Sequence, residues 1–341
     1  MSLDLAQLIQ AHYSVGCRPE DVSCWQSGQA FSGARIWKVG SRQGRFALRR
    51  WPGEFRDRAR LSWVQAVLRH AQQRGVTYLA VPLDTREGAP CFAAEGHLWE
   101  LAPWLPGEAN DQTPPSEERL RAAMQALAWF HAAVADFPGA SDGPAPVAVE
   151  RRDACARWLN ARLLADLSQQ IDASVDRELA TSARRYLAQC VPLLPNTGNQ
   201  LTGVCDSTIP ILPCLRDVWT PHVLFQQAAV SGIIDYGAMR FDTPAACISR
   251  LLASLAGDDP AAWRIGLAAY GEVRALSAME QRLIRVLDLA ATLLSGMNWL
   301  EWIFLQRRSF DDPRWVRRRL ELAADRLERL VTGEHIWHQS V

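Results

Sequence analysis

Lysine is almost missing from this chain of 341 residues, because Lys38 is the only one and arginine makes up the rest of the 37 basic residues. A Walker A phosphate-binding loop needs a lysine after its glycines, and a pyridoxal-phosphate enzyme needs one for its Schiff base. Lys38 follows no such loop and lies inside a predicted strand, so the sequence excludes both classes. The 37 acidic residues bring the net charge to zero, which argues against a nucleic-acid partner.

Paired cysteines are missing as well. The eight cysteines are scattered without CxxC spacing, and the chain has no HExxH, GxSxG or GxGxxG motif. Scattered cysteines in a chain of this length are typical of reduced thiols in a cytosolic protein. The N-terminus carries no basic start before an apolar run, and no apolar run approaches the ~18 residues of a membrane span. We therefore expect a cytoplasmic protein with no membrane partner.

The residues that are present predict a globular protein whose character changes along the chain. Hydrophobic residues make up 48% of it and charged residues 22%, which suffices for a core. The first part contains several runs that alternate with period two, and one amphipathic helical pattern. Strands are expected at 22–25, 34–39, 45–51, 77–82 and 92–101, the last interrupted at Gly96, a helix at 55–74, and a glycine- and serine-rich loop at 27–33.

Beyond the proline-rich turn at 103–107 the pattern becomes mainly helical. A boundary near Leu105 predicts two lobes, residues 1–104 and 105–341. The fold class is therefore α+β, with a small β-rich lobe before a large, mainly helical one. Helices are expected at 116–136, 151–171, 175–190 and from 244 to about 331, a loop at 137–149, and short strands at 208–212, 223–225 and 230–234.

The short strands of the second part carry the residues best suited to chemistry. Asp217 lies in a loop, His222 follows five residues later, and Asp235 ends the second strand of a hairpin. An aspartate on a short loop can orient a hydroxyl group and accept its proton. An aspartate at a strand end can hold a divalent metal ion against phosphate oxygens. The pattern therefore indicates a site for phosphate chemistry.

This hairpin resembles the catalytic hairpin of the aminoglycoside-phosphotransferase-like branch of the protein-kinase fold. In such proteins the catalytic aspartate is followed after four residues by asparagine, and later by Asp-Phe-Gly or Asp-Tyr-Gly. Here Leu215-Arg216-Asp217 is followed after four residues by His222, and later by Asp235-Tyr236-Gly237. The hinge at 101–107 and the first strands are similar too, so the resemblance covers about residues 20–255. It implies a two-lobed protein-kinase-like fold.

The resemblance also implies an ATP- or GTP-dependent phosphotransferase that acts on a hydroxyl group of a small molecule. Asp217 would be the catalytic base, and Arg216 would support its loop. Asp235 and His222 would hold Mg²⁺ or Mn²⁺, and Arg49 would contact the phosphates. The implied nucleotide site comprises Gly28, Ser32, Gly33, Ile36, Ala47, Arg49, Pro103, Leu105, Leu224 and Ile234.

Four positions depart from the family pattern. His222 stands where the family has asparagine, and imidazole is a softer ligand than an amide oxygen. Arg49 stands at the family's lysine and would contact phosphates through a planar fork. The helix after Arg49 offers Gln65 in place of a glutamate. Cys247 takes the slot of an aspartate that props the catalytic loop.

Two other functions stay open. Because of these departures, the chain is also compatible with a kinase-like protein that binds nucleotide without transferring phosphate. A cysteine hydrolase would use Cys214 with His222 and Asp217, but nothing in the sequence places oxyanion donors beside Cys214.

The sequence does not name the acceptor. A polycationic aminoglycoside needs an acidic cluster, and the pairs Asp258-Asp259 and Asp311-Asp312 are the candidates. Each pair is followed by proline, which is typical of a loop or a helix cap. The sequence therefore does not favour an aminoglycoside over a sugar, an amino alcohol or a choline-like acceptor.

His131 is interpreted as a core residue. It lies in the run Trp129-Phe130-His131 on the apolar face of a predicted helix. A histidine in this setting is more often a core side chain with satisfied hydrogen bonds than a metal ligand. The tryptophan-rich run at 299–302 is interpreted as helix core in the same way.

Overall fold

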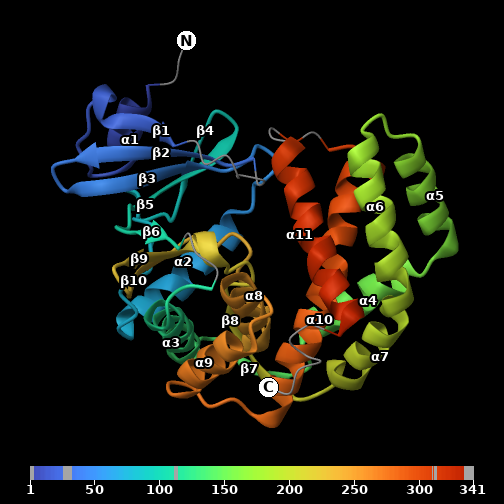
Figure 1. Ribbon diagram of the computed structural model, residues 1–341. Coiled ribbons are helices and arrows are strands. Elements are labelled where there is room, and N and C mark those ends of the chain that lie inside the picture. The colour runs from blue at the N-terminus through green and yellow to red at the C-terminus, as the bar shows by residue number, and fades with distance from the viewer. Residues whose placement is uncertain (1–3, 26–32, 111–113, 309, 311–312, 334–341) are drawn as a thin grey trace. The chain divides into compact units, whose positions relative to one another are not determined.

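The computed structural model describes residues 4–25, 33–110, 114–308, 310 and 313–333. The fold is α+β, as predicted, and the chain forms two compact units. The first comprises Met1–Asn110 and Pro221–Met239, and we call it the β-rich unit; the second comprises Asp111–Thr220 and Arg240–Val341, and we call it the helical unit (Figure 1). The hairpin that follows His222 thus belongs with the N-terminal residues, while Asp217 belongs to the helical unit.

A five-stranded antiparallel sheet in the order β1-β2-β3-β5-β4 forms the centre of the β-rich unit. Period-two alternation separates its faces, because Phe46 and Leu48 of β3 enter a hydrophobic core while Ala47 and Arg49 point to the opposite side. The elements are α1 (Leu5–His12), β1 (Val22–Trp25), β2 (Arg35–Ser41), β3 (Gly44–Arg50), α2 (Arg58–Gln73), β4 (Phe92–Ala94) and β5 (His97–Pro103). Helix α1 was not predicted from the sequence.

The strand predicted at 77–82 is wrong. Leu79 makes only an isolated parallel bridge to Ile233, and the carbonyl of Tyr78 accepts a hydrogen bond from the Ile233 N–H at 2.8 Å. The segment therefore supports the end of the hairpin and does not extend the large sheet. The hairpin strands β9 (Val223–Gln226) and β10 (Ala229–Ile233) form a second sheet with β6 (Glu108–Ala109), in the order β10-β9-β6.

Helices dominate the second unit, and a small sheet in the order β11-β8-β7 joins them. Large buried side chains such as Trp158, Tyr186 and Trp263 fill its interior. The elements are α3 (Glu117–Ala133), β7 (Ser141–Gly143), α4 (Pro146–Trp158), α5 (Ala161–Asp172), α6 (Arg177–Cys190), α7 (Leu194–Cys205), β8 (Ile209–Cys214), β11 (Arg240–Asp242), α8 (Pro244–Ala256), α9 (Pro260–Gly271), α10 (Ala278–Leu300) and α11 (Pro313–Thr332).

The single helix predicted at 151–171 is wrong, because the chain breaks there into α4 and α5. Helix α4 ends at Trp158, and Asn160 caps α5, since its side-chain oxygen accepts the N–H groups of Arg162 and Leu163 at 3.0 and 3.1 Å. Helix α7 and strands β6, β7 and β11 were not predicted, and the loop expected at 137–149 contains β7 and the start of α4. Pro195 stands in the first turn of α7, where proline is compatible with a helix although it usually signals a break.

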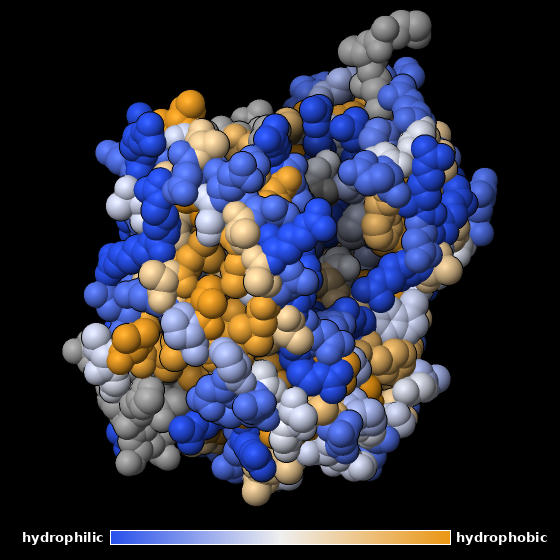
Figure 2. Space-filling model, turned by 90° about the vertical axis from the view of Figure 1, so that its right-hand side faces the viewer, coloured by the Kyte–Doolittle hydropathy of each residue, from blue (hydrophilic) through white to orange (hydrophobic). Residues whose placement is uncertain are grey.

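One helical stretch, Ala278–Leu305, is long and apolar enough to cross a membrane by length and composition. The protein interior buries 78% of its most apolar window. The side on which α5 and α6 lie has a mostly hydrophilic surface, with one large hydrophobic patch and smaller ones apart from it (Figure 2). Packing inside the helical unit therefore accounts for the apolar character of this stretch.

Candidate functional site

Arg49 and Asp235 form an ion pair within the β-rich unit. The Nη2 of Arg49, on β3, lies 3.0 Å from Oδ1 of Asp235, which follows β10. The guanidinium also stands 4.1 Å from the centre of the Trp51 ring, a cation–π geometry. Among the residues that the structure describes, none accepts a hydrogen bond from the buried Nε of Arg49. This group thus keeps a donor for an anion such as phosphate.

A second acid beside Arg49 was missed by the sequence analysis. The strand register pairs Arg49 with Glu100 on β5. Gln65, the expected substitute for a helix glutamate, instead donates a buried hydrogen bond to the carbonyl of Pro82 at 2.7 Å. Burial raises the pKa of Glu100 and the charge of Asp235 adds to this shift, although Arg49 opposes it. Glu100 is thus the carboxyl group that holds its proton more readily.

Glu100→Gln should therefore change the stability by less than ~1 kcal/mol. A carboxyl group whose pKa is raised in the folded chain contributes stability at low pH, and this contribution is lost as the pH rises through the raised pKa. Glutamine mimics the protonated form and removes this pH dependence. Urea unfolding of the wild type and of Glu100→Gln across the acid range measures this pH dependence. A loss of ~3 kcal/mol in the free energy of unfolding of the variant would instead identify a fully ionised Glu100.

His222 stands on the other side of the Asp235 carboxylate. Its Nε2 lies 3.8 Å from Oδ2 of Asp235, and its carbonyl accepts a hydrogen bond from the N–H of Ile234 at 2.9 Å. Asp235 has a φ of +63°, which is unusual for a residue with a side chain and often marks a functional position. Burial favours a higher pKa for Asp235, but the charges of Arg49 and His222 outweigh it and lower that pKa below 3.8.

The predicted nucleotide residues of the β-rich unit are distributed over both of its sheets. Gly28 and Ser32 lie outside the described residues. Gly33 has a φ of +65°, and Ile36 on β2 pairs with Arg49 on β3. Ala47 pairs with Ala102 on β5, and Pro103 ends that strand opposite Phe46.

Two further residues of the predicted nucleotide site, Leu105 and Leu224, approach each other over Gly232. A Cβ atom at Gly232 would stand 2.9 Å from a methyl group of Leu105 and 3.1 Å from a methyl group of Leu224. A Cβ atom at this position would therefore require these leucine side chains to shift. Ile234 is half-buried two residues further along, just before Asp235.

Asp217 lies in the helical unit, in a tight turn where its N–H donates to the carbonyl of Leu215 at 2.8 Å. Its Oδ1 accepts a hydrogen bond from Nη2 of Arg250 at 2.8 Å, and its side chain is 47% exposed. Arg250 and Arg319 stand 5.7 and 5.1 Å from the centre of the Trp219 ring. The carboxylate is thus accessible and has a cationic, aromatic neighbourhood.

Arg216 anchors the loop that carries Asp217. Its backbone has a φ of +66°, and its guanidinium contacts the fully buried carboxylate of Asp242 and, at 3.2 Å, Glu150 on α4. The Asp242 carboxylate also accepts the N–H groups of Val147 and Thr243. These bonds tie the loop to β11 and α4, so the geometry suits Arg216 to positioning.

A sulfur atom occupies the position expected for the loop-propping aspartate. The N–H of Arg216 donates to Sγ of Cys247 at 3.4 Å. Next to it, the thiol of Cys214 donates to the carbonyl of Asp242 at 3.2 Å. Burial and the neighbouring Cys247 raise the pKa of the Cys214 thiol well above its ordinary 9.0. A nucleophilic cysteine needs a lowered pKa, so this environment argues against the cysteine hydrolase.

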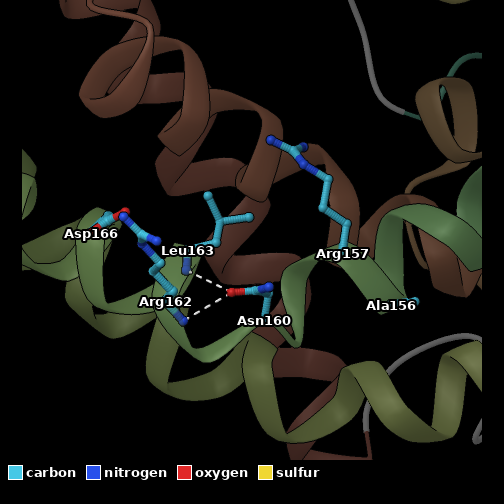
Figure 3. Close-up of a pocket in the computed structure, with 6 residues that line it drawn as sticks. All are labelled: Ala156, Arg157, Asn160, Arg162, Leu163 and Asp166. Atoms are coloured by element: carbon cyan, nitrogen blue, oxygen red, sulfur yellow. Dashed lines mark hydrogen bonds between the residues drawn. The ribbon is translucent and has the colours of Figure 1, made fainter.

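The cavities that described residues of the helical unit line include two with charged walls. One of about 240 Å³ is lined by Glu150, Arg151, Arg250, Ser295 and Asn298 among others, and Arg250 connects it to Asp217. The other, of about 360 Å³, lies where α4 meets α5 and is lined by Arg157, Asn160, Arg162 and Asp166 with two apolar side chains (Figure 3). The second cavity contains no predicted site residue.

Arg157 beside this second cavity allows a pH-dependent prediction. Its guanidinium donates to both carboxylate oxygens of Glu301 at 2.9 and 2.6 Å, and these bonds lower the pKa of Glu301 below 4.5. A lowered pKa gives stability that is present above 4.5 and lost as the pH falls through the folded value. Glu301→Gln should cost about 0.5–1 kcal/mol at neutral pH and nothing in strong acid, by urea unfolding. A cost that is equal at both pH values would contradict this.

The sequence of this chain matches the model of one known protein family. The family model described as the phosphotransferase enzyme family matches residues 28–283. Among curated proteins, none matches this chain in sequence.

Solved structures match the chain over nearly its whole length. A spectinomycin phosphotransferase in complex with ADP and spectinomycin has a TM-score of 0.64 at 12% identity, covering 95% of this chain and 98% of its own. An aminoglycoside phosphotransferase from Alicyclobacillus acidocaldarius has 0.63 at 18%, covering 96% and 94%. A microcompartment-associated aminopropanol kinase has 0.61 at 12%, covering 98% and 99%. These matches confirm the predicted kinase-like fold.

Proposed function

Since the chain belongs to the phosphotransferase enzyme family, we propose that it transfers the γ-phosphoryl group of ATP or GTP to a hydroxyl group of a small molecule. The observation that carries this proposal is the Asp235 carboxylate between Arg49 and His222, at 3.0 and 3.8 Å. In this arrangement the Arg49 guanidinium is a cation that can bind phosphate, and the ionised Asp235 carboxylate beside it can bind a metal ion. Structural relatives bind ADP in one case, and AMP-PNP with Ca²⁺ in an amicoumacin kinase.

A divalent metal ion fits the donor atoms of the β-rich unit. Asp235 Oδ2 and His222 Nε2 are 3.8 Å apart, and two ligands at about 2.1 Å from one ion span at most ~4.2 Å. We assign both residues as metal ligands, for Mg²⁺ or Mn²⁺. The ion would neutralise charge on the phosphate oxygens. Arg49 binds a phosphate oxygen through its unused Nε–H.

Asp217 receives the role of catalytic base. Its exposed carboxylate can orient the acceptor hydroxyl and take its proton. Arg250 fixes the carboxylate through a hydrogen bond to its Oδ1. Arg216 positions the loop through Asp242. We propose that residues 1–104 supply most of the nucleotide site, together with Leu105 and the hairpin residues that fold with them in the β-rich unit, and that the rest of 105–341 supplies the catalytic loop and the acceptor site.

The acceptor that these charges favour is neutral or anionic. Arg250 lies 2.8 Å from Asp217 and also lines the 240 Å³ cavity. Of the acidic pairs that a polycation could use, the described pair is already engaged, because Asp258 pairs with Arg326 and Arg329 at 3.0 and 2.8 Å, and Asp259 caps α9. Asp311 and Asp312 lie outside the described residues. We therefore place a small neutral or anionic alcohol in this cavity.

A transfer screen tests the proposal. Purified protein is incubated with γ-labelled ATP or GTP, with Mg²⁺ or Mn²⁺, and with hydroxylated compounds sorted into cationic, neutral and anionic sets. We expect labelled product from the neutral or anionic sets. A labelled aminoglycoside would overturn the acceptor class, while nucleotide binding without any labelled product would favour the kinase-like protein without transfer. We propose the cytoplasm as its location, with no nucleic-acid or membrane partner.

His222→Asn should shift the metal preference toward Mg²⁺. Asparagine offers a hard oxygen, whereas imidazole nitrogen suits Mn²⁺ better than Mg²⁺. The ratio of initial transfer rates with Mn²⁺ and Mg²⁺ should therefore fall in the variant. An unchanged ratio would mean that His222 does not bind the metal.

A further inference from the structure

A buried cluster of three metal-binding side chains lies in the helical unit, apart from the proposed metal ligands. It consists of His131 on α3, Cys214 at the end of β8 and Cys247 on α8, and all three side chains have 0% exposure. One ring nitrogen and the two sulfur atoms lie within 4.8 Å of one another. The elements that carry them, with α9, pack against one another (Figure 1).

His131 differs from the satisfied core histidine that the sequence predicts. Its Nδ1 is hydrogen-bonded to the hydroxyl of Tyr270 at 2.8 Å. Its Nε2 is buried without a hydrogen-bond partner in the part of the chain that the structure describes. An unpaired polar atom in a protein interior is costly and needs an explanation. A ring held at one nitrogen by a neighbour, with the other nitrogen free, is the arrangement of metal-binding histidines.

We propose that His131, Cys214 and Cys247 bind a thiophilic d¹⁰ metal ion, Zn²⁺ or Cu⁺. Two sulfur ligands and one imidazole are the donor set that such ions prefer. Metal–ligand bonds of about 2.0–2.3 Å place ligand atoms about 3.5–4 Å apart. The three atoms lie within 4.8 Å of one another, so the longest of these distances needs to shorten by no more than about 1 Å. When Zn²⁺ binds, both thiols release a proton to solvent, and the two thiolates neutralise the ion inside the apolar interior.

The site would tie the catalytic loop to the helical core. Cys214 directly precedes Leu215, and Cys247 accepts the N–H of Arg216 at 3.4 Å. An ion bound here joins the start of this loop to α3 and α8. Because it binds the folded chain and not the unfolded one, it should raise the melting temperature. The function of the ion is thus structural, and it differs from the metal proposed at Asp235.

Metal uptake by the full-length protein tests the proposal. The reduced, chelator-treated protein is titrated with Zn²⁺ against a chromophoric chelator, and in a separate anaerobic arm with Cu⁺. We expect one tightly bound ion per chain in at least one arm, and a thiolate charge-transfer band when Co²⁺ replaces Zn²⁺. His131→Gln and Cys247→Ser should lose both signals. Cys190→Ser is the matched control, because Cys190 is equally buried but donates to the carbonyl of Leu293.

Tyr270→Phe keeps the test decisive if the ligand variants fail to fold. It leaves all three ligands in place and removes only the hydroxyl group that orients His131. Loss of such a partner should weaken metal affinity about 10–100-fold. Absence of stoichiometric uptake in both arms would overturn the proposal, as would uptake that is unchanged in His131→Gln, Cys247→Ser and Tyr270→Phe.

Discussion

Asp217→Asn should leave the fold and nucleotide binding intact and slow phosphoryl transfer by about 10²–10⁴-fold. The amide oxygen of asparagine can still accept the hydrogen bond that Arg250 donates at 2.8 Å, so the turn keeps its contact. The amide cannot accept the proton of an acceptor hydroxyl. Because the side chain is half-exposed, the stability should change by no more than about 0.5 kcal/mol. Transfer rates with the acceptor found in the screen, together with calorimetric nucleotide titration, measure both effects.

Asp166→Asn is the matched control for Asp217→Asn. Asp166 is an exposed aspartate of the helical unit that lines the other cavity, so its substitution also removes one negative charge (Figure 3). It should leave transfer unchanged. Equal rates for Asp217→Asn and the wild type would remove Asp217 from the role of base. A loss of nucleotide binding in Asp217→Asn would instead show that this residue acts on the nucleotide.

Local patterns sufficed to predict the strands that position the site. Alternation along β3 placed Ala47 and Arg49 on one face, and the structure has them opposite the core residue Leu48. The hairpin of β9 and β10 also follows the expected ranges, with Asp235 just beyond its end. Each of these features depends on neighbouring residues in the chain, which is why the sequence alone could predict them.

Features that depend on pairing between distant segments were not predictable in the same way. Glu100 reaches Arg49 only through the register of β3 and β5, whereas the sequence analysis sought an acid on the next helix. The grouping of His131 with Cys214 and Cys247 joins three elements that are far apart in the chain. The only sequence signal for it was Cys247 in the slot of an aspartate, and a single cysteine does not indicate a metal site.

Asp235→Ala should abolish the metal-dependent part of nucleotide binding, because it removes the only carboxylate of the proposed ligand pair. Affinity with Mg²⁺ or Mn²⁺ should fall to the value measured with a chelator present. The remaining affinity reflects contacts that need no metal. Calorimetric titration with a non-hydrolysable ATP analogue, with and without the metal, measures the difference. Metal-dependent affinity equal to that of the wild type would exclude Asp235 as a ligand.

The fold should survive Asp235→Ala, because Glu100 can replace the lost charge beside Arg49. The negative charge of Asp235 helps to raise the pKa of Glu100, so its removal favours ionisation of Glu100 next to the guanidinium. The double variant Asp235→Ala/Glu100→Gln leaves Arg49 without either acid and should lose about 1–3 kcal/mol more than the sum of the single variants. Asp84→Ala is the control, since Asp84 also pairs with an arginine, Arg69, at 2.5 Å and is similarly exposed. Asp84→Ala should leave metal-dependent nucleotide binding unchanged. If the losses of stability in the double variant Asp235→Ala/Glu100→Gln are additive, Glu100 does not compensate for Asp235.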